Sequence, residues 1–102
     1  MTPVFQLRVA EKAARQIQNA SAWWDLNRSA APDGFRNEIE RGFLFISSHP
    51  NLGAEVQSER IRNLRRVLLK PISSFLYYEV ADEGFVEVLA LWHTSRGNEP
   101  PF

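Results

Sequence analysis

Arginine, tyrosine and histidine gather in the last third of the sequence, where they could perform acid–base chemistry. The residues in question are Arg66, Tyr77, His93 and Arg96. Cleavage of RNA by internal attack of the 2′-hydroxyl needs a base for that hydroxyl, an acid for the leaving oxygen and a cation for the phosphorane charge. His93 or Glu79 could be the base, Tyr77 or His93 the acid, and Arg66 or Arg96 the cation. Any small sheet from a chain with ten arginines would offer such a set, so pure binding stays open as the alternative.

Other kinds of catalytic site find no support in the sequence. It contains no glycine-rich phosphate loop, no G-x-S-x-G, no H-E-x-x-H and no EF-hand loop. The absence of cysteine excludes disulfides, thiolate zinc sites and cysteine nucleophiles. The two histidines, His49 and His93, are far apart in the sequence. We therefore expect no metal site and no cofactor.

The charges balance overall but are segregated along the chain. Twelve basic and twelve acidic residues give a net charge of zero, which argues against bulk nucleic-acid binding and against sequence-specific DNA binding by this chain alone. A basic block contains Arg60, Arg62, Arg65, Arg66 and Lys70, and an acidic block contains Glu79, Asp82, Glu83 and Glu87. Either adjacent strands pair the two blocks across a sheet surface, or the basic block is an exposed binding surface.

The first half of the chain predicts a short strand followed by a helical hairpin. Alternation of apolar residues over Phe5–Val9 indicates a strand. A helix is predicted over 11–27 and a second from Pro32 through about Ser48, with apolar stripes formed by Ala13, Ile17, Ala20 and Trp24 and by Phe35, Ile39, Phe43 and Ile46. Four large apolar residues lie off these stripes and form either the edge of the core or a binding hot spot: Trp23, Leu26, Leu44 and Phe45. For Trp23 the core edge is the favoured interpretation.

The second half predicts three strands. Residues 53–59 are expected to form a loop, and strands are expected over 61–69, 75–80 and 85–92, with a turn at Asp82–Gly84. In the last strand we expect Val86, Val88 and Ala90 on one face and Glu87, Leu89, Leu91 and His93 on the other. The predicted fold is a single α+β domain over 1–102 in the order β-α-α-β-β-β, with the helical hairpin packed on one face of a small, mostly antiparallel sheet. The other face is expected to be polar and to carry Arg66, Lys70, Tyr77, Glu79, Glu87 and His93, and the tail 94–101 is expected to be irregular.

Three segments carry a resemblance to a known family. They are Leu64-Arg65-Arg66-Val67-Leu68-Leu69, Phe75-Leu76-Tyr77-Tyr78-Glu79-Val80, and the run from Val86 through Trp92-His93-Thr94-Ser95-Arg96-Gly97. This order of an Arg-rich strand, a strand with a Tyr-Tyr pair, and a strand closing on Trp-His with an Arg shortly after resembles the RelE/ParE toxin superfamily, and within it the ParE-like branch of plasmid stabilisation proteins. The His49–Gly53 turn after the second helix is similar too. The resemblance covers nearly the whole chain.

The resemblance implies a small α+β toxin of a bacterial type II toxin–antitoxin system. A ParD-like antitoxin, with a ribbon-helix-helix domain and a flexible tail, would wrap and silence it. ParE-like members are associated with poisoning DNA gyrase, and RelE-like members cut messenger RNA on the ribosome. The near absence of Lys and the Thr94 that follows His93 depart from the ribonuclease pattern.

We therefore expect a toxin that inhibits gyrase by protein binding, with no catalytic residue of its own. A RelE-type endoribonuclease using Arg66, Tyr77, His93 and Arg96, or a non-toxic antitoxin-binding module, are the alternatives. The residues expected to bind the antitoxin or the target are Trp23, Leu26, Leu44, Phe45, Arg65, Arg66, Trp92, His93 and Arg96. The start of the chain, Met1–Gln6, lacks a signal-peptide pattern, and no apolar run could span a bilayer, so a cytoplasmic location without membrane contact is expected.

Overall fold

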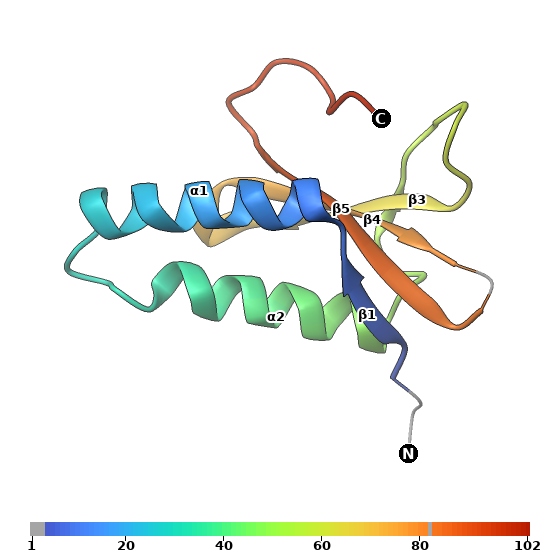
Figure 1. Ribbon diagram of the computed structural model, residues 1–102, viewed down its shortest axis with the longest axis horizontal. Coiled ribbons are helices and arrows are strands. Elements are labelled where there is room, and N and C mark those ends of the chain that lie inside the picture. Colours follow the sequence, from blue (N-terminus) through green and yellow to red (C-terminus); the bar gives the residue numbers. More distant parts are fainter. Residues whose placement is uncertain (1–3, 82) are drawn as a thin grey trace.

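Two helices cover one face of a five-stranded sheet (Figure 1). The computed structural model describes residues 4–81 and 83–102. The elements are β1 (Gln6–Val9), α1 (Glu11–Asn27), α2 (Gly34–Ser48), β2 (Ala54–Glu55), β3 (Leu64–Leu69), the 3₁₀ turn η1 (Lys70–Ile72), β4 (Ser74–Val80) and β5 (Phe85–His93). The strand order is β1-β5-β4-β3-β2, in which β1 runs parallel to β5 and the other neighbours are antiparallel. The predicted α+β fold is confirmed; Asp82 and Met1–Pro3, used above for the turn and the signal-peptide argument, lie outside the described residues.

The helical hairpin buries the two stripes that the periodicity predicts. Ala13 is fully buried, and Phe35, Ile39 and Ile46 are each less than a tenth exposed. Trp24 packs on this core and its indole N–H donates to the Ala31 carbonyl at 2.8 Å, which fixes the link between the helices. The second helix begins at Gly34 and not at Pro32, because Pro32 and Asp33 belong to the turn that precedes it. Neither helix of the described chain is long and apolar enough to cross a membrane.

A β-bulge in β5 changes which residues face the helices. Tyr77 of β4 is opposite Ala90, but the next residue, Tyr78, is opposite Val88, so Leu89 is an extra residue in β5. Val86 and Val88 therefore pack under the helices, whereas Ala90 belongs to a cluster on the other face. The expectation that these three residues share one face was wrong, because strict alternation takes no account of an inserted residue.

The face of the sheet away from the helices carries a second apolar cluster. Leu64, Tyr77, Ala90 and Trp92 form its buried centre, and Tyr77 is 1% exposed. The C-terminal segment covers it, because the Phe102 ring lies 5.5 Å from the Tyr77 ring and the Trp92 indole N–H donates to the Asn98 carbonyl at 2.7 Å. The prediction of a polar face with Tyr77 on its surface was therefore wrong, and the irregular tail is an ordered part of the fold.

The segment between α2 and β3 also differs from expectation. Ala54 and Glu55 form a short strand opposite Arg66 and Arg65, within the stretch that was expected to be a loop. The next strand begins at Leu64 and not at Ile61, because Asn63 adopts a left-handed conformation with φ 50° and ends a turn there. This two-residue strand adds an edge to the sheet beyond β3.

The turn after α2 is held against the sheet by two side chains. The Tyr78 hydroxyl donates to the Pro50 carbonyl at 2.8 Å and accepts the Gly53 N–H at 3.1 Å. Arg65 donates to the carbonyl oxygens of Asn51 and Gly53 at 2.9 and 2.7 Å. Burial raises the pKa of the Tyr78 hydroxyl above its usual value of 10.0, while the Gly53 hydrogen bond and the Arg65 charge oppose that rise. The turn is thus fixed by a neutral, buried phenol.

We expect Gly53→Ala to destabilise the protein by about 1–3 kcal/mol, because a Cβ at this position would overlap the Tyr78 hydroxyl oxygen. Chemical denaturation measures the difference in unfolding free energy. Gly97→Ala is the matched control, since a Cβ there meets nothing within 4 Å, and its effect should stay within about 0.5 kcal/mol. Equal effects of the two substitutions would contradict a tight contact at Gly53.

The Tyr78 hydroxyl also predicts a pH dependence of stability. Its pKa is raised in the folded state, so the stabilisation is fully present below the unfolded pKa of about 10. Above that pH the unfolded state loses the proton first, and stability falls until the pH passes the folded pKa. Urea denaturation from pH 8 to 11 should show this fall, and the fall should be smaller in Tyr78→Phe. An identical slope in that variant would contradict the assignment.

Candidate binding site

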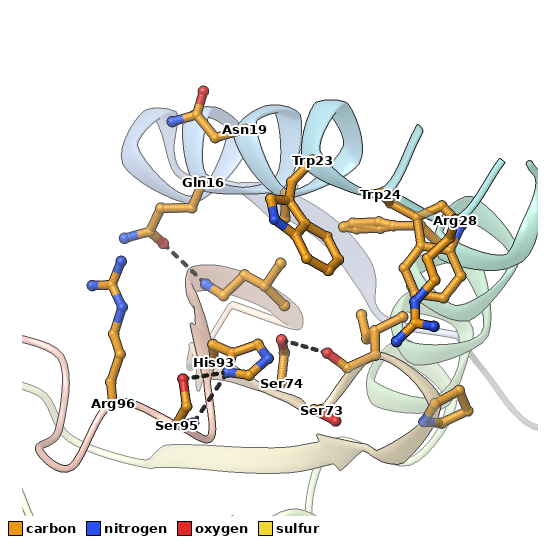
Figure 2. Close-up of a pocket in the computed structure, with 15 residues that line it drawn as sticks. Gln16, Asn19, Trp23, Trp24, Arg28, Ser73, Ser74, His93, Ser95 and Arg96 are labelled. Atoms are coloured by element: carbon orange, nitrogen blue, oxygen red, sulfur yellow. Dashed lines mark hydrogen bonds between the residues drawn. The ribbon is translucent and has the colours of Figure 1, made fainter. Parts of the chain in front are cut away.

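A groove of about 530 Å³ lies between α1 and the end of β5 (Figure 2). Ala20 and Trp23 of α1 form one wall, and Leu91 and His93 of β5 form the other. Two cations, Arg28 at the end of α1 and Arg96 after β5, lie at its borders. Its volume is within the range of ligand-binding pockets. The groove therefore combines an apolar lining with positive charge.

Gln16 crosses this groove from helix to sheet. Its Oε1 atom accepts the Leu91 backbone N–H at 3.0 Å, as the dashed line in Figure 2 shows. Because β1 pairs with β5 only at Phe85–Val88, this part of β5 lacks a neighbouring strand on that side among the described residues. A side-chain amide thus occupies the place that the carbonyl of a strand would take.

His93 is oriented by the turn that follows it. Its Nδ1 atom accepts the Ser95 backbone N–H at 3.1 Å and lies 2.8 Å from the Ser95 hydroxyl. A backbone N–H can only donate, so Nδ1 is an acceptor and the proton of the neutral ring is on Nε2. The His93 ring is therefore held by Ser95, two residues further along the chain, at the turn that follows β5.

All four residues of the ribonuclease hypothesis line one smaller cavity of about 260 Å³: Arg66, Tyr77, His93 and Arg96. The groups are engaged with each other and with aromatic rings. Arg66 donates to the Tyr77 hydroxyl at 3.1 Å and its guanidinium lies 4.1 Å from the centre of the Phe75 ring. Arg96 lies 4.2 Å from the centre of the Trp92 ring. Tyr77 is almost wholly buried beneath the tail, so a substrate cannot reach it in this arrangement.

The sequence left open whether Arg65 pairs with the acidic block or belongs to an exposed basic surface. In the structure it is a largely buried residue that holds the turn after α2. Besides the turn carbonyls, it contacts the Glu55 carboxylate at 3.3 Å, and its side chain is 18% exposed. The sheet register places Tyr78 and Tyr77 opposite Arg65 and Arg66. Pairing of the basic block with the acidic block across the sheet is therefore not what fixes these arginines.

The four apolar residues that lie off the helical stripes are exposed, and they lie in two separate pairs, one on each helix. Trp23 is 56% and Leu26 84% exposed near the end of α1. Leu44 and Phe45, 64% and 40% exposed, lie ten or more residues into α2, which is about 15 Å along the helix axis from its start. Because the helices are antiparallel, the two pairs lie toward opposite ends of the hairpin (Figure 1). Trp23 lines the groove and does not close the core, contrary to the favoured expectation.

The sequence did not single out Gln16, Arg28 or Asn98. Gln16 and Arg28 line the groove, and Asn98 receives the Trp92 indole N–H. Position within the helix could have indicated Gln16, since it lies beside Ile17 and Ala20 on the buried side; no local signal marks Arg28 or Asn98. Among the described residues no group of His, Asp and Glu could hold a metal ion.

The described residues form a small α+β fold, and its groove combines aromatic side chains with two arginines. The family model described as the ParE toxin of the type II toxin–antitoxin system, parDE, matches residues 7–97. The chain therefore belongs to the ParE toxin family. Its fold is similar to a solved structure titled "Chromosomal ParDE TA system from P. aeruginosa", with a TM-score of 0.68 and 16% identity over 90% of this chain and 98% of that chain. Comparison with curated proteins finds no match.

The Trp92 contact predicts how firmly the tail is held. Trp92→Phe removes the donor to the Asn98 carbonyl, which should loosen residues 94–102 and cost about 0.5–1.5 kcal/mol. Hydrogen exchange of the tail and denaturation measure the two effects. Trp23→Phe is the control, because Trp23 is largely exposed and does not belong to the apolar cluster beneath the tail. Unchanged tail exchange in Trp92→Phe would contradict the role assigned to the indole.

Proposed function

We propose that this ParE-family toxin inhibits DNA gyrase by binding it, in the bacterial cytoplasm, and that a cognate ParD-like antitoxin neutralises it. The observation that carries a binding function is the surface at the end of α1. Trp23 and Leu26 are exposed there beside Arg28, and the groove continues to Arg96. Exposed aromatic and apolar residues next to arginine are typical of binding hot spots. The resemblance to the gyrase-directed branch supplies the target.

The contacts in the smaller cavity, of about 260 Å³, support a protein-binding function rather than RNA cleavage. A general acid must be within hydrogen-bond reach of the substrate, whereas the Tyr77 hydroxyl accepts from Arg66 beneath the tail. Glu99 lines the same cavity, and its carboxylate would repel an RNA phosphate. The zero net charge also gives no long-range attraction for a ribosome.

The ribonuclease remains the second candidate function for one reason. Arg66, Tyr77, His93 and Arg96 line one cavity although they come from three strands and the segment after them. Movement of the tail would expose that set. A protein with neither activity would be the third alternative, an antitoxin-binding module.

The two toxin mechanisms predict different outcomes when the purified chain is assayed and when its expression is induced. We expect inhibition of gyrase supercoiling and a DNA-damage response, with messenger RNA intact. His93→Gln should weaken gyrase inhibition less than about tenfold, since it changes at most one contact. In a ribonuclease the same substitution would lower cleavage about 10²–10⁴-fold.

Circular dichroism of His93→Gln controls for loss of folding. Messenger RNA cut in phase with codons, together with normal gyrase activity, would overturn the gyrase proposal and support the ribonuclease. Absence of both activities, with antitoxin binding preserved, would support the non-toxic module.

A further inference from the structure

The side of the sheet opposite β1 ends in a strand that its neighbour covers only in part. β2 pairs with β3 at Arg65 and Arg66, so among the described residues no strand lies beside Val67–Leu69 on this side. Gly53, the residue before β2, already belongs to the turn that Tyr78 holds. The second half of β3 is therefore an open edge, and an open edge can accept an extended peptide.

The backbone groups of Leu68 point out of this edge. The Asn63 carbonyl accepts the Val80 N–H at 3.2 Å, on the β4 side. The Leu64 carbonyl accepts the Val56 N–H at 2.9 Å, on the β2 side. Because β3 pairs with β4 in continuous register, alternation along the strand directs the N–H and the carbonyl of Leu68 to the β2 side as well. One residue of an added antiparallel strand can exchange two hydrogen bonds with such a residue.

The side chains at this edge are apolar and basic. Leu68 is 50% exposed and lies opposite Phe75 of β4. The Arg66 guanidinium lies 4.1 Å from the centre of the Phe75 ring, and Lys70 is exposed directly after the strand. Neither Arg66 nor Lys70 takes part in the four ion pairs of the described chain, nor does Glu99, which lines the same cavity as Arg66. The edge is therefore complementary to an acidic segment that carries an apolar side chain.

The same charges disfavour a second copy of this chain at the edge. Two β3 edges paired about Leu68 would place Lys70 of one copy opposite Arg66 of the other, and like charges directly opposite each other destabilise a sheet. The position opposite Arg66 is also taken by Ala54 of β2. Lys70 of a second copy would have to occupy the same place, whereas a separate segment can end before it.

We propose that the open edge of β3 binds an extended, acidic segment of a partner protein as an added antiparallel strand. One residue of the segment exchanges two hydrogen bonds with the Leu68 backbone and packs its side chain on Leu68, because residues directly opposite each other point to the same face. Carboxylates of the segment lie near Lys70 and Arg66. In the strand order β3 is two places from β5, so this edge is separate from the groove beside α1, and it does not require gyrase as the target.

Hydrogen exchange of the free chain tests the open edge without any partner. The Leu68 amide should exchange at least about tenfold faster than the amides of Arg65 and Val67, because the alternation directs those two toward β4. Equal protection of the three amides would show that the edge is closed and would overturn the proposal.

A peptide titration of the full chain tests the chemistry of the occupant. The probe is the acetylated and amidated peptide Glu-Val-Glu-Val-Glu, and the control probe is Lys-Val-Lys-Val-Lys with the same blocked ends. At low salt the glutamate peptide should bind at least about tenfold more tightly than the lysine peptide and should slow exchange of the Leu68 amide. No binding, equal binding of the two peptides, or binding that leaves the Leu68 amide unchanged would each overturn the proposal.

Charge reversal tests the location of the bound peptide. Leu68→Glu with Lys70→Glu should weaken binding of the glutamate peptide about tenfold or more, because both substitutions place a carboxylate beside an acidic occupant. Leu44→Glu with Lys12→Glu is the matched control, since the same two residue types are exposed there on the helices, and it should change the affinity less than about threefold. Circular dichroism of both double variants controls for loss of folding. Equal affinities of the two double variants would overturn the proposal.

Two further results would assign the edge or the peptide differently. Loss of peptide binding in Arg28→Glu with Arg96→Glu, but not in Leu68→Glu with Lys70→Glu, would place the peptide in the groove beside α1 and overturn the β3 edge as its site. A dimer of the chain alone that the Leu68 and Lys70 substitutions dissociate would assign the edge to a second copy and overturn the acidic segment as its occupant.

Discussion

One extra residue in β5 determines which side chains meet on each face of the sheet. Up to Val88 the even-numbered residues pack under the helices, and after the bulge at Leu89 the odd-numbered Leu91 does so. Ala90 and Trp92 consequently join Tyr77 on the opposite face. Without the bulge the large indole of Trp92 would lie against α1, where the groove now is. Two clusters and the groove therefore depend on a single local irregularity.

The bulge also gives the C-terminal segment its place. Trp92 lies on the face of the sheet away from the helices, where its indole N–H donates to the Asn98 carbonyl. The Arg96 guanidinium stacks on the Trp92 ring. The tail thereby returns over Tyr77, where Phe102 packs. His93, at the end of the same strand, lines both cavities. The polar C-terminal segment is thus held in place by the buried Trp92 indole. The same segment covers Tyr77, which a ribonuclease would need to bring into contact with its substrate.

Regular features of the fold could be predicted from the sequence, and irregular ones could not. The helical stripes and the order of elements follow from periodicity, which requires only neighbouring residues. The bulge leaves no such trace, because residues 88–92 are all apolar and every register buries most of them. A two-residue strand such as β2 is too short for any alternation. The roles of Arg65 and the tail depend on contacts between residues distant in sequence, and the groove depends on where β1 ends beside β5.

The preference of this chain for arginine has an architectural cause. Arg65 bridges two carbonyls and a carboxylate, and Arg8, Arg66 and Arg96 lie 3.7, 4.1 and 4.2 Å from the centres of aromatic rings. A planar guanidinium can stack and donate in several directions at once, which an ammonium group cannot do in the same geometry. Stacking on a ring satisfies the flat face of the group and leaves its edge free to bind. The same arginines that complete the sheet surfaces can therefore present directed positive charge to a partner, although the net charge of the chain is zero.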